Sequence, residues 1–466
     1  MAGVIGRARR VHFIGIGGIG MSGIAELLVN LGYEVSGSDM ERTDITNRLE
    51  SLGARIAEGH DALNVSDAEV VVYSSAVRSS NPEMLAAQAR GLDVIPRAEL
   101  LAELMRLRQG IAVAGAHGKT TTTSMIALVL DVAGLDPTAV IGGRVSSFGS
   151  NAKLGRGKYL VAEADESDRS FLRLAPRFAV ITNIDREHLE AYRDFDELKA
   201  SFVQFANSVP ANGAVILCSD DENLRAIRGD IRRHVVTYGL DETADVTAAD
   251  VHLNGFASEC TVRARRPGGR AVELGQLQLA VPGRHNVLNA LAAVAMAREL
   301  GVAWSDIARA LAGFQGAERR FQRRGQMRGI VVVEDYGHHP TEIAAVIAAA
   351  RPIPERRLIV AFQPHRFTRT QLLMSEFGRA FAGADVVVMT DIYAAGEDPI
   401  AGVTLDALAE SVKAEFRGEL HVVPSLGEVP NVLADLARPG DMIVLLGAGS
   451  IGGIAMPVIA ALGDAI

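Results

Sequence analysis

Short apolar runs recur along the chain, and each ends in glycines or polar residues before a longer mixed segment begins. Runs bounded in this way predict buried strands, whereas mixed segments with helical periodicity predict helices. The predicted strands are 11–14, 34–38, 69–73, 110–114, 159–162, 178–182, 330–333, 357–362, 386–390 and 442–446. The predicted helices include 21–30, 124–130 and 290–300. Strands that alternate with helices predict an α/β fold with mostly parallel sheets.

Length sets the number of domains. At 466 residues the chain has room for about three domains, which we place at 1–108, 109–318 and 319–466. No uninterrupted apolar stretch of about 20 residues occurs, so no transmembrane helix is expected. Arginines at positions 7, 9 and 10 precede an apolar run, but five glycines interrupt that run. It therefore fits strand, turn and helix better than a signal peptide.

Charge and cysteine usage narrow the class of protein. The formal net charge of −9 argues against broad nucleic-acid binding. Cys218 and Cys260 lie far apart and belong to no metal-binding pattern, which is typical of reduced thiols in the cytoplasm. We expect a cytoplasmic protein that acts on small molecules, is a monomer or weak homodimer, and neither binds nucleic acid nor inserts into a membrane.

The stretch AGAHGKTTTTS at 114–124 carries the most specific chemical signal. It lies between a predicted strand and a predicted helix, so its backbone amides are expected to bind an anion at the helix start. Lys119 would add a positive charge for the outer phosphates of a nucleotide, and Thr120 a hydroxyl for Mg²⁺. The match to the phosphate-loop pattern is incomplete, because Val113 stands where the pattern has a glycine and Gly115 makes a shorter loop. An ordinary helix start is the alternative.

A second glycine-rich turn lies near the N-terminus. The pattern GxGxxG follows the strand 11–14 and is formed by Gly15, Gly17 and Gly20, with Gly18 inside it. Asp39 follows Gly20 by 19 residues, the spacing of a carboxylate that holds a ribose hydroxyl. Read alone, the pattern predicts NAD, but the same amides fit the pyrophosphate of a UDP-sugar. Ser74 and Ser75 follow the strand 69–73 at the sheet edge where ligands bind, and capping of that strand by Ser74 is the alternative.

Polar residues also end two strands of the central segment. The strand 159–162 is followed by acidic residues that suit a metal site or a solvated surface: Glu163, Asp165, Glu166 and Asp168. The strand 178–182 leads to Asn183 and His188. The segment 283–289 offers side chains for recognition of a base edge, namely His285, Asn286 and Asn289. Helix capping by Asn286 is the alternative there.

Two strand ends of the last segment are rich in histidine and arginine. The strand 330–333 leads to EDYGHHP, and 357–362 leads to QPHRFTR. We expect these ends to form one cationic rim suited to a carboxylate. A further GxGxxG at 447–452 is followed by only fourteen residues, so we interpret its glycines as packing positions.

Seven motifs together carry a family resemblance: HFIGIGGIGMSG, AGAHGKTTTT, EADESD, TNIDREH, PGRHNVLNA, DYGHHPTE and QPHRFTRT. They resemble the Mur ligases of peptidoglycan synthesis, in order and across all three predicted domains. The resemblance implies an N-terminal Rossmann-like UDP-sugar domain and a central phosphate-loop ATPase domain. A C-terminal Rossmann-like domain would close over ATP and bind the amino acid. The implied reaction joins L-alanine to the carboxylate of UDP-N-acetylmuramate through an acyl phosphate, and ATP gives ADP and phosphate.

The resemblance also implies cofactors and site residues. ATP would act with two Mg²⁺ ions, for which Mn²⁺ could substitute, and the metal-binding residues would be Thr120, Glu163 and His188. The catalytic residues would be Lys119, Glu163 and His188. The ATP-binding residues would be Ala114, Gly115, Ala116, His117, Gly118, Lys119, Thr120, Thr121, Asn183, His285, Asn286, Asn289, Arg320 and Asp335. The UDP-sugar would contact Gly15, Gly17, Gly18, Gly20, Ser38, Asp39, Ser74 and Ser75. The amino-acid and muramyl side would be lined by Tyr336, His338, Arg366 and Arg369.

The chain departs from the family pattern at two positions. Glu187 precedes His188 where the family has aspartate, which leaves the role of position 187 open. Phe202 occupies the position of the carbamoylated lysine of several sister ligases, although Lys199 is near, so we expect no carbamoyl-lysine.

Three other functions compete with this interpretation. A sister ligase that adds a tripeptide or glutamate fits less well, because of GIGGIGMSG and DYGHHPTE. An NAD-dependent oxidoreductase would explain GxGxxG and Asp39, but not the phosphate loop or the acidic strand end. A nucleotide switch would bind ATP without turnover that depends on an amino acid.

Overall fold

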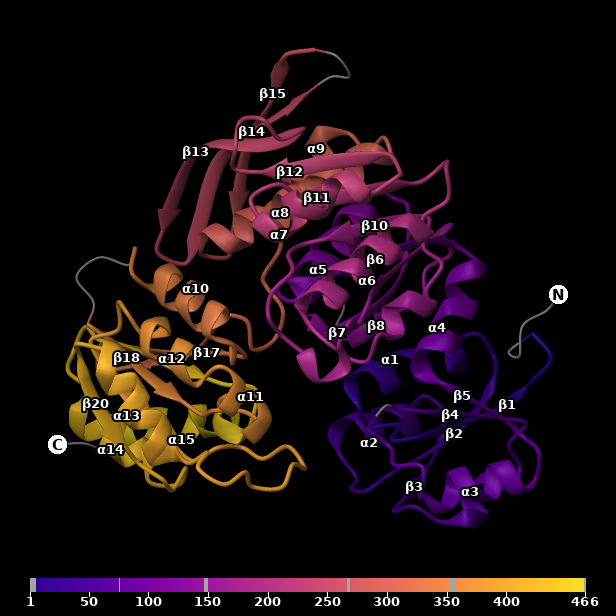
Figure 1. The fold of residues 1–466 in the computed structure, drawn as a ribbon, viewed down its shortest axis with the longest axis horizontal. Coiled ribbons are helices and arrows are strands. Elements are labelled where there is room, and N and C mark those ends of the chain that lie inside the picture. The colour runs from indigo at the N-terminus through magenta and orange to yellow at the C-terminus, as the bar shows by residue number, and fades with distance from the viewer. Residues whose placement is uncertain (1–5, 75, 146–149, 266–268, 353–356, 465–466) are drawn as a thin grey trace. The chain divides into compact units, whose positions relative to one another are not determined.

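The computed structural model describes residues 6–74, 76–145, 150–265, 269–352 and 357–464, so Ser75 of the predicted UDP-sugar site lies outside the described residues. Within these ranges the strands form three sheets (Figure 1). By compactness the chain divides into two units. The first comprises Met1–Ala249, Thr261–Leu277 and Leu288–Phe314, and the second comprises Asp250–Cys260, Gln278–Val287 and Gln315–Ile466.

The first sheet has five parallel strands in the order β3-β2-β1-β4-β5. Its strands are β1 (Arg10–Ile14), β2 (Glu34–Asp39), β3 (Arg55–Glu58), β4 (Val70–Tyr73) and β5 (Asp93–Pro96). The helices of this part are α1 (Ile19–Asn30), α2 (Asp44–Ser51), α3 (Pro82–Ala89) and α4 (Arg97–Arg106). The strand order reverses between β1 and β4, and open α/β sheets bind ligands at the carboxyl ends of the strands at such a point. The glycine turn that follows β1 lies there.

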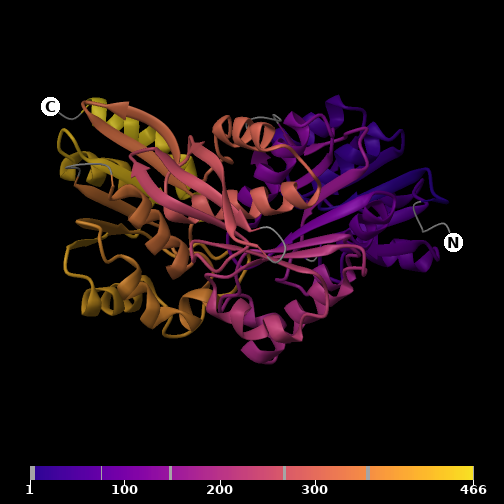
Figure 2. The same cartoon turned by 90° about the horizontal axis from the view of Figure 1, so that it is seen from above.

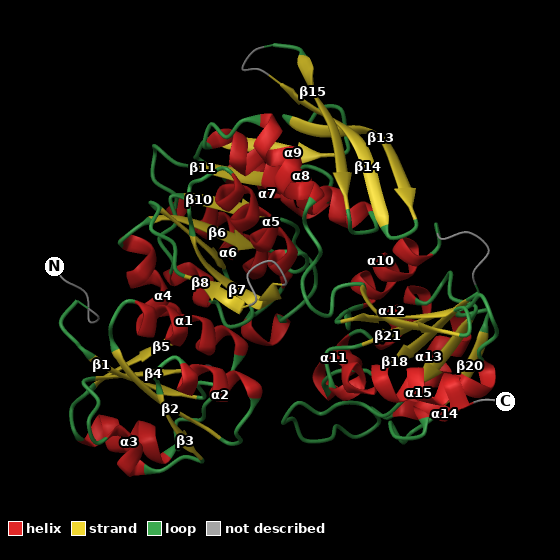
Figure 3. Cartoon of the chain, turned by 180° about the vertical axis from the view of Figure 1, so that it is seen from behind, coloured by secondary structure: helices red, strands yellow, loops and turns green. Residues whose placement is uncertain are grey.

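The second sheet has ten strands in the order β15-β14-β13-β12-β11-β10-β6-β9-β7-β8. They are β6 (Gln109–Ala114), β7 (Thr138–Val145), β8 (Ser150–Lys153), β9 (Tyr159–Glu163), β10 (Phe178–Ile181), β11 (Ala214–Cys218), β12 (Val235–Gly239), β13 (Val246–Asn254), β14 (Ala257–Arg265) and β15 (Ala271–Leu279). The last three lie side by side (Figure 3). Because β9 and β10 flank β6 in parallel register, their carboxyl ends meet at the edge where the phosphate loop begins.

The helices of the central part correct two predicted boundaries. They are α5 (Lys119–Val132), α6 (Phe195–Ser208), α7 (Glu222–Ile227), α8 (Arg284–Glu299) and α9 (Trp304–Ala312). Helix α5 begins at Lys119 rather than 124, because Gly118 takes a left-handed φ of 81° and the chain enters the helix directly. Helix α8 begins at Arg284, so His285, Asn286 and Asn289 lie inside its first turns and not before it. Burial of Val287 and Leu291 outweighs the weak helix propensity of asparagine and histidine.

The third sheet has six strands in the order β16-β17-β21-β18-β19-β20. They are β16 (Gln322–Met327), β17 (Ile330–Asp335), β18 (Leu358–Phe362), β19 (Val386–Met389), β20 (Glu419–Val422) and β21 (Met442–Leu446), and only β16 pairs antiparallel. The helices are α10 (Pro340–Ala350), α11 (Phe367–Leu372), α12 (Met374–Ala380), α13 (Leu405–Glu415), α14 (Val429–Leu436) and α15 (Ala455–Asp464). Helices α10, α12 and α13 bury one face of the sheet, and α14 and α15 bury the other (Figure 2).

The strands and the last glycine motif agree with the predictions from the sequence. All predicted strands are present, with ends shifted by at most one residue for most of them and two for 330–333, and the α/β class with mostly parallel sheets is confirmed. The packing interpretation of the last glycine motif is also confirmed. A Cβ on Gly447 would come within 2.8 Å of the Gln363 carbonyl oxygen, and one on Gly449 within 2.5 Å of Gln363 Oε1. No helix in the described part of the chain is long and apolar enough to cross a membrane.

Candidate active site

The phosphate loop, residues 114–120, connects β6 to α5 and is held by two asparagines. The backbone amide of His117 donates to Asn183 Oδ1 (2.8 Å), and Asn183 Nδ2 donates to the His117 carbonyl oxygen (3.0 Å). On the other side, Thr122 Oγ1 donates to Asn289 Oδ1 (3.2 Å). Gly118 must be glycine here, because a Cβ would lie 2.6 Å from Asn289 Oδ1. Asn183 and Asn289, predicted as nucleotide contacts, thus shape the loop.

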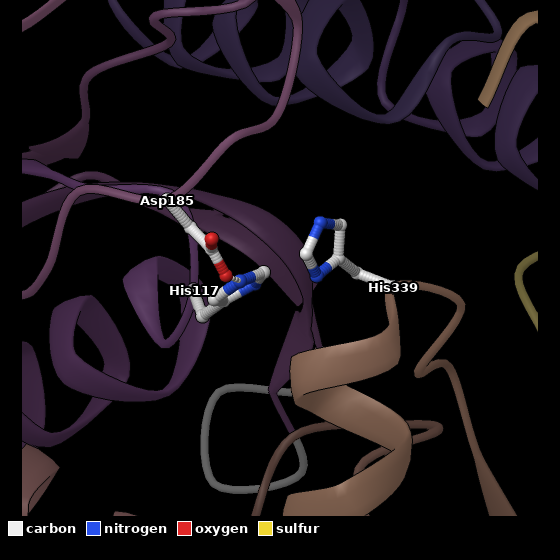
Figure 4. Close-up of side chains that lie close together, drawn as sticks. All are labelled: His117, Asp185 and His339. Carbon is white, nitrogen blue, oxygen red and sulfur yellow. Dashed lines mark hydrogen bonds and ion pairs between the residues drawn. The ribbon is translucent and has the colours of Figure 1, made fainter. Parts of the chain in front are cut away.

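The side chain of His117 is fixed to the segment that follows β10. Its Nε2 lies 2.8 Å from Asp185 Oδ2 (Figure 4). Its Nδ1 lies 3.9 Å from Glu187 Oε2, and Glu187 Oε1 lies 3.6 Å from His188 Nε2. The buried carboxylate of Glu187 therefore lies between two histidines. The sequence alone had left the role of position 187 open.

Lys119 lies at the start of α5 with its ammonium group folded back over the loop. Its Nζ donates to the carbonyl oxygens of Gly115 (2.6 Å) and Ala116 (3.1 Å), and to Glu166 Oε1 (2.8 Å). Burial lowers the pKa of Lys119, but the carboxylates of Glu166 and Asp165 outweigh burial and raise the pKa overall. The ammonium is therefore charged at the place where a phosphate would meet the loop amides.

Two of the residues predicted to hold metal lie close to the same strand, β7. Glu163 Oε1 accepts from the amide of Gly142 (2.7 Å), and a Cβ on the next residue, Gly143, would come within 3.1 Å of Thr120 Cγ2. Thr120 and Glu163 therefore lie beside consecutive residues of β7, and hydroxyl and carboxylate oxygens are ligands that Mg²⁺ accepts. Burial lowers the pKa of His188, but the carboxylates of Glu190, Glu187 and Glu166 outweigh it and raise the pKa overall. Glu166 and Lys119 are among the charged neighbours of His188, so its ring lies near the phosphate loop.

Phe202 lies in an aromatic cluster and not in a metal site. Its ring centroid lies 5.2 Å from that of Phe171, whose ring lies 5.1 Å from that of Phe205. Lys199 instead pairs with Asp196 at 2.7 Å. The expectation that no carbamoyl-lysine is used stays a prediction.

A cavity of about 360 Å³ connects the glycine turn after β1 with the phosphate loop. It is lined by Gly18, Ile19, Gly20, Met21, Ser74, Arg97, Leu101, Lys119, Val140, Ile141, Gly142, Glu163 and Asp165. The cavity therefore unites the predicted UDP-sugar residues Gly18, Gly20 and Ser74 with the predicted catalytic residues Lys119 and Glu163.

Ser38 and Asp39, at the end of the neighbouring strand β2, hold the glycine turn in shape. The carbonyl oxygen of Ser38 accepts from the amides of Gly15 (2.9 Å) and Ile16 (3.0 Å), and Asp39 Oδ2 accepts from the amide of Gly17 (2.7 Å). Asp39 Oδ1 accepts from its neighbour's amide at position 40 (2.8 Å). The Ser38 hydroxyl is buried and donates to Glu83 Oε2 (2.6 Å).

These contacts correct the sequence-based picture of the turn. The amides of Gly15 and Gly17 are used internally, and that of Gly18 donates to the Gly15 carbonyl oxygen (3.2 Å). The amides that lack an intrahelical acceptor at the start of α1 belong to Ile19 and Gly20.

Sequence reasoning missed Arg97, the first residue of α4. Its Nη2 lies 3.3 Å from Asp165 Oδ2, and its guanidinium lies against Gly20, where a Cβ would come within 3.0 Å of Cζ. Arg97 adds a cation to the cavity beside the amides of Ile19 and Gly20. The available signal was the position after β5, but the sequence DVIP was not identified as a strand.

The histidine- and arginine-rich ends of β17 and β18 do form one rim in the second unit. The rings of His338 and His365 lie 5.6 Å apart, and His365 stacks on Tyr393 at 5.5 Å. Burial lowers the pKa of His365 to about 3, helped by the positive charges around it. The neutral ring accepts from Arg369 Nη1 (3.2 Å), and Arg366 lies 3.8 Å from Glu397. The predicted meeting of the two strand ends is confirmed, whereas the binding of a carboxylate there stays a prediction.

Asp335 and its neighbours lie beside this rim. Both oxygens of Asp335 accept backbone amides, from Gly337 and Phe321, each at 2.7 Å, and burial raises its pKa to about 6. The guanidinium of Arg320 lies 5.2 Å from the ring centroid of Tyr336. Burial lowers the pKa of His285 to about 4, so that ring is neutral.

Asn286 does not cap α8. Its Nδ2 donates to the Pro282 carbonyl oxygen (2.7 Å), so it holds the preceding turn. Asn286 lies inside the first turn of α8 and is not its N-cap residue, so the capping alternative is wrong.

Three domain families match successive parts of the chain. The Mur ligase family catalytic domain matches residues 10–109, the Mur ligase middle domain matches 113–297, and the Mur ligase glutamate ligase domain matches 319–449. The chain belongs to the Mur ligase family. The predicted three-domain α/β architecture is confirmed by the structural match described next.

Individual relatives show which members of the family the chain is similar to. The chain is 51% identical over 456 residues to the UDP-N-acetylmuramate–L-alanine ligase of Syntrophus aciditrophicus, covering 98% of this chain and 94% of that protein. It is 53% identical over 446 residues to the protein of the same name from Solibacter usitatus, covering 96% and 93%. The solved UDP-N-acetylmuramate–alanine ligase of Thermotoga maritima superposes with a TM-score of 0.82 at 30% identity, over 98% of this chain and 100% of that one. A murein peptide ligase of Psychrobacter arcticus superposes with a TM-score of 0.72 at 25% identity, over 98% and 99%.

Proposed function

We propose that the chain is an ATP-dependent ligase that joins L-alanine to the carboxylate of UDP-N-acetylmuramate in the synthesis of peptidoglycan precursors. The observation that carries this proposal is the single cavity that holds both the start of α1 and Lys119. A UDP-sugar anchored at α1 can direct its carboxylate toward a nucleotide phosphate at Lys119. An NAD enzyme would have no use for the phosphate-loop end of this cavity.

We assign the sugar end of the cavity to the N-terminal segment, 1–108. The pyrophosphate would accept from the amides of Ile19 and Gly20, where the helix dipole also favours negative charge. Arg97 and Ser74 would add side-chain donors. Gly15, Gly17, Ser38 and Asp39 would act by holding the turn in shape.

We assign ATP to the central segment, 109–318. The loop amides and Lys119 would bind its outer phosphates, and Thr120 and Glu163 would hold a Mg²⁺ that neutralises charge on them. His188 would serve a second ion, and Mn²⁺ could substitute for Mg²⁺ at these ligands.

The chemistry follows from these positions. A carboxylate oxygen of the muramyl group attacks the γ-phosphorus of ATP, the bond to ADP breaks, and an acyl phosphate forms. The L-alanine amine, having lost its proton, then attacks the acyl carbon, and the C–O bond to phosphate breaks. Both steps gather negative charge on oxygens, which Lys119 and the backbone amides stabilise.

We assign the amino acid to the C-terminal segment, 319–466. Arg366 and Arg369, with Tyr336 and His338, would bind the L-alanine carboxylate, because planar guanidinium groups match carboxylate geometry. Arg320 would reach the phosphates, Asp335 would contact the ATP ribose, and His285 and Asn286 would lie near adenine. This segment would close over ATP, and the protein would work in the cytoplasm as a monomer or weak homodimer.

The test is phosphate release from ATP in the presence of UDP-N-acetylmuramate and each of L-alanine, L-serine and glycine. We expect release that needs both the sugar and an amino acid, and that is fastest with L-alanine. A preference for glutamate or a tripeptide would indicate a sister ligase. ATP binding without any dependence on an amino acid would indicate a nucleotide switch.

A further inference from the structure

Every proton of the Lys119 ammonium is already engaged. Two are donated to carbonyl oxygens of the phosphate loop itself, at Gly115 and Ala116. The third goes to Glu166 Oε1 at 2.8 Å, which belongs to the segment after β9. An ammonium group has three donors and no more, so the lysine is held from two independent parts of the chain.

Glu166 is itself held rigidly. Glu166 is 2% exposed, and its backbone carbonyl oxygen accepts a hydrogen bond from the Tyr192 hydroxyl at 2.5 Å. Its second carboxylate oxygen, Oε2, is buried without a hydrogen-bond partner within the described ranges. Burying a carboxylate in this way is costly unless a specific contact offsets it, and the ion pair with Lys119 is that contact.

We propose that Glu166 is the positioning residue of Lys119, and that it holds the ammonium over the phosphate loop by a contact separate from those to the loop carbonyls. A lysine side chain has many rotamers, and an anchor that restricts them places the charge before the phosphate arrives. When ATP binds, its phosphate oxygens replace loop carbonyls as acceptors, while Glu166 keeps the lysine aimed. Glu166 therefore acts on phosphoryl transfer only through Lys119.

This role predicts opposite changes in binding and in turnover. Glu166→Gln keeps the shape and removes the charge, so Lys119 is less firmly aimed and kcat should fall by about tenfold or more, the loss expected for one charged hydrogen bond. A buried negative charge beside an anionic ligand is also removed, so a non-hydrolysable ATP analogue should bind at least as tightly as to the wild type. AMP, which lacks the outer phosphates, should bind with unchanged affinity.

The decisive comparison is a double-mutant cycle with Lys119→Ala. In that background Glu166→Gln should cause no further loss of kcat, because the residue it positions is gone. Tyr192→Phe, which releases the backbone of Glu166, should lower kcat in the same sense but less. Glu50→Gln is the control, since it removes a carboxylate that pairs with Arg42 in the N-terminal segment and belongs to none of the contacts around Lys119.

Two outcomes would overturn the inference. One is kcat losses that multiply in the double mutant, which would mean that Glu166 acts independently of Lys119. The other is weakened binding of the ATP analogue together with the lost kcat, which would mean general damage to the loop. The inference rests on the proposed ATP-dependent function, and wild-type turnover separates the two. If the wild type releases no phosphate, the function itself fails, whereas a normal wild type with an additive cycle refutes only the role of Glu166.

Discussion

Gly20→Ala should weaken UDP-N-acetylmuramate binding without weakening the fold. Gly20 is the second residue of α1, and a Cβ there would lie within 3.0 Å of Arg97 Cζ. The atoms it would meet are the end of a flexible side chain, so the guanidinium can move aside at little cost in stability. Alanine also favours a helix over glycine by about 1 kcal/mol, so the free energy of unfolding should stay constant or rise.

The functional cost follows from what Arg97 would lose. If Arg97 donates to the pyrophosphate, its displacement removes one charged hydrogen bond, worth about 1.5–3 kcal/mol. That loss corresponds to about a 10- to 150-fold weaker Kd for the UDP-sugar. The affinity for ATP should hardly change, because the phosphate loop does not contact Gly20.

Calorimetric titration of both ligands measures the effect, with Arg97→Ala as the reference. The combination of Gly20→Ala and Arg97→Ala should bind the UDP-sugar no worse than Arg97→Ala alone, since both changes remove the same contact. Normal UDP-sugar binding by Gly20→Ala would refute the assigned role of Arg97. Equal losses for both ligands would mean damage to the whole unit.

Three further predictions concern single residues. Lys119→Ala should lower kcat by about 10²–10³, measured as phosphate release, because a charge that faces the transferring phosphoryl group is lost. Near-normal turnover in this variant would contradict the assignment of the phosphate loop. Arg366→Ala should raise KM for L-alanine and Arg366→Lys should restore it only in part, since lysine cannot form a bidentate contact; wild-type alanine kinetics in both would contradict the rim assignment. Asp335 has a folded pKa raised from 3.8 to about 6, so its contribution to stability is lost as pH rises from about 4 to 6. Relative to Asp335→Asn, the wild type should therefore lose about 2 kcal/mol of unfolding free energy between pH 4.5 and 7.5 in urea titrations, and a constant difference would speak against a raised pKa.

The sequence was informative wherever the signal was local. The phosphate loop was recognisable because an apolar strand, two glycines and a lysine follow one another within a few residues. The cationic rim was predictable for a different reason. Parallel strands end at the same sheet edge, so polar residues after β17 and β18 had to meet.

Contacts between distant segments could not be predicted from the sequence. Nothing local shows that residues 38 and 39 use up the amides of the glycine turn, because those bonds come from the neighbouring strand. Arg97 was missed since β5 is short and polar at its start. The pairing of Lys119 with Glu166, rather than with another acid of the same cluster, depends on how the segment after β9 folds back.

The central claim is that the muramyl carboxylate attacks ATP, and isotope transfer tests it most directly. UDP-N-acetylmuramate labelled with oxygen-18 in its carboxylate is turned over with ATP and L-alanine, and the released phosphate is analysed by mass spectrometry. The account predicts that one labelled oxygen moves to inorganic phosphate while the other remains in the new amide. Phosphate without label, formed alongside the amide product, would contradict it.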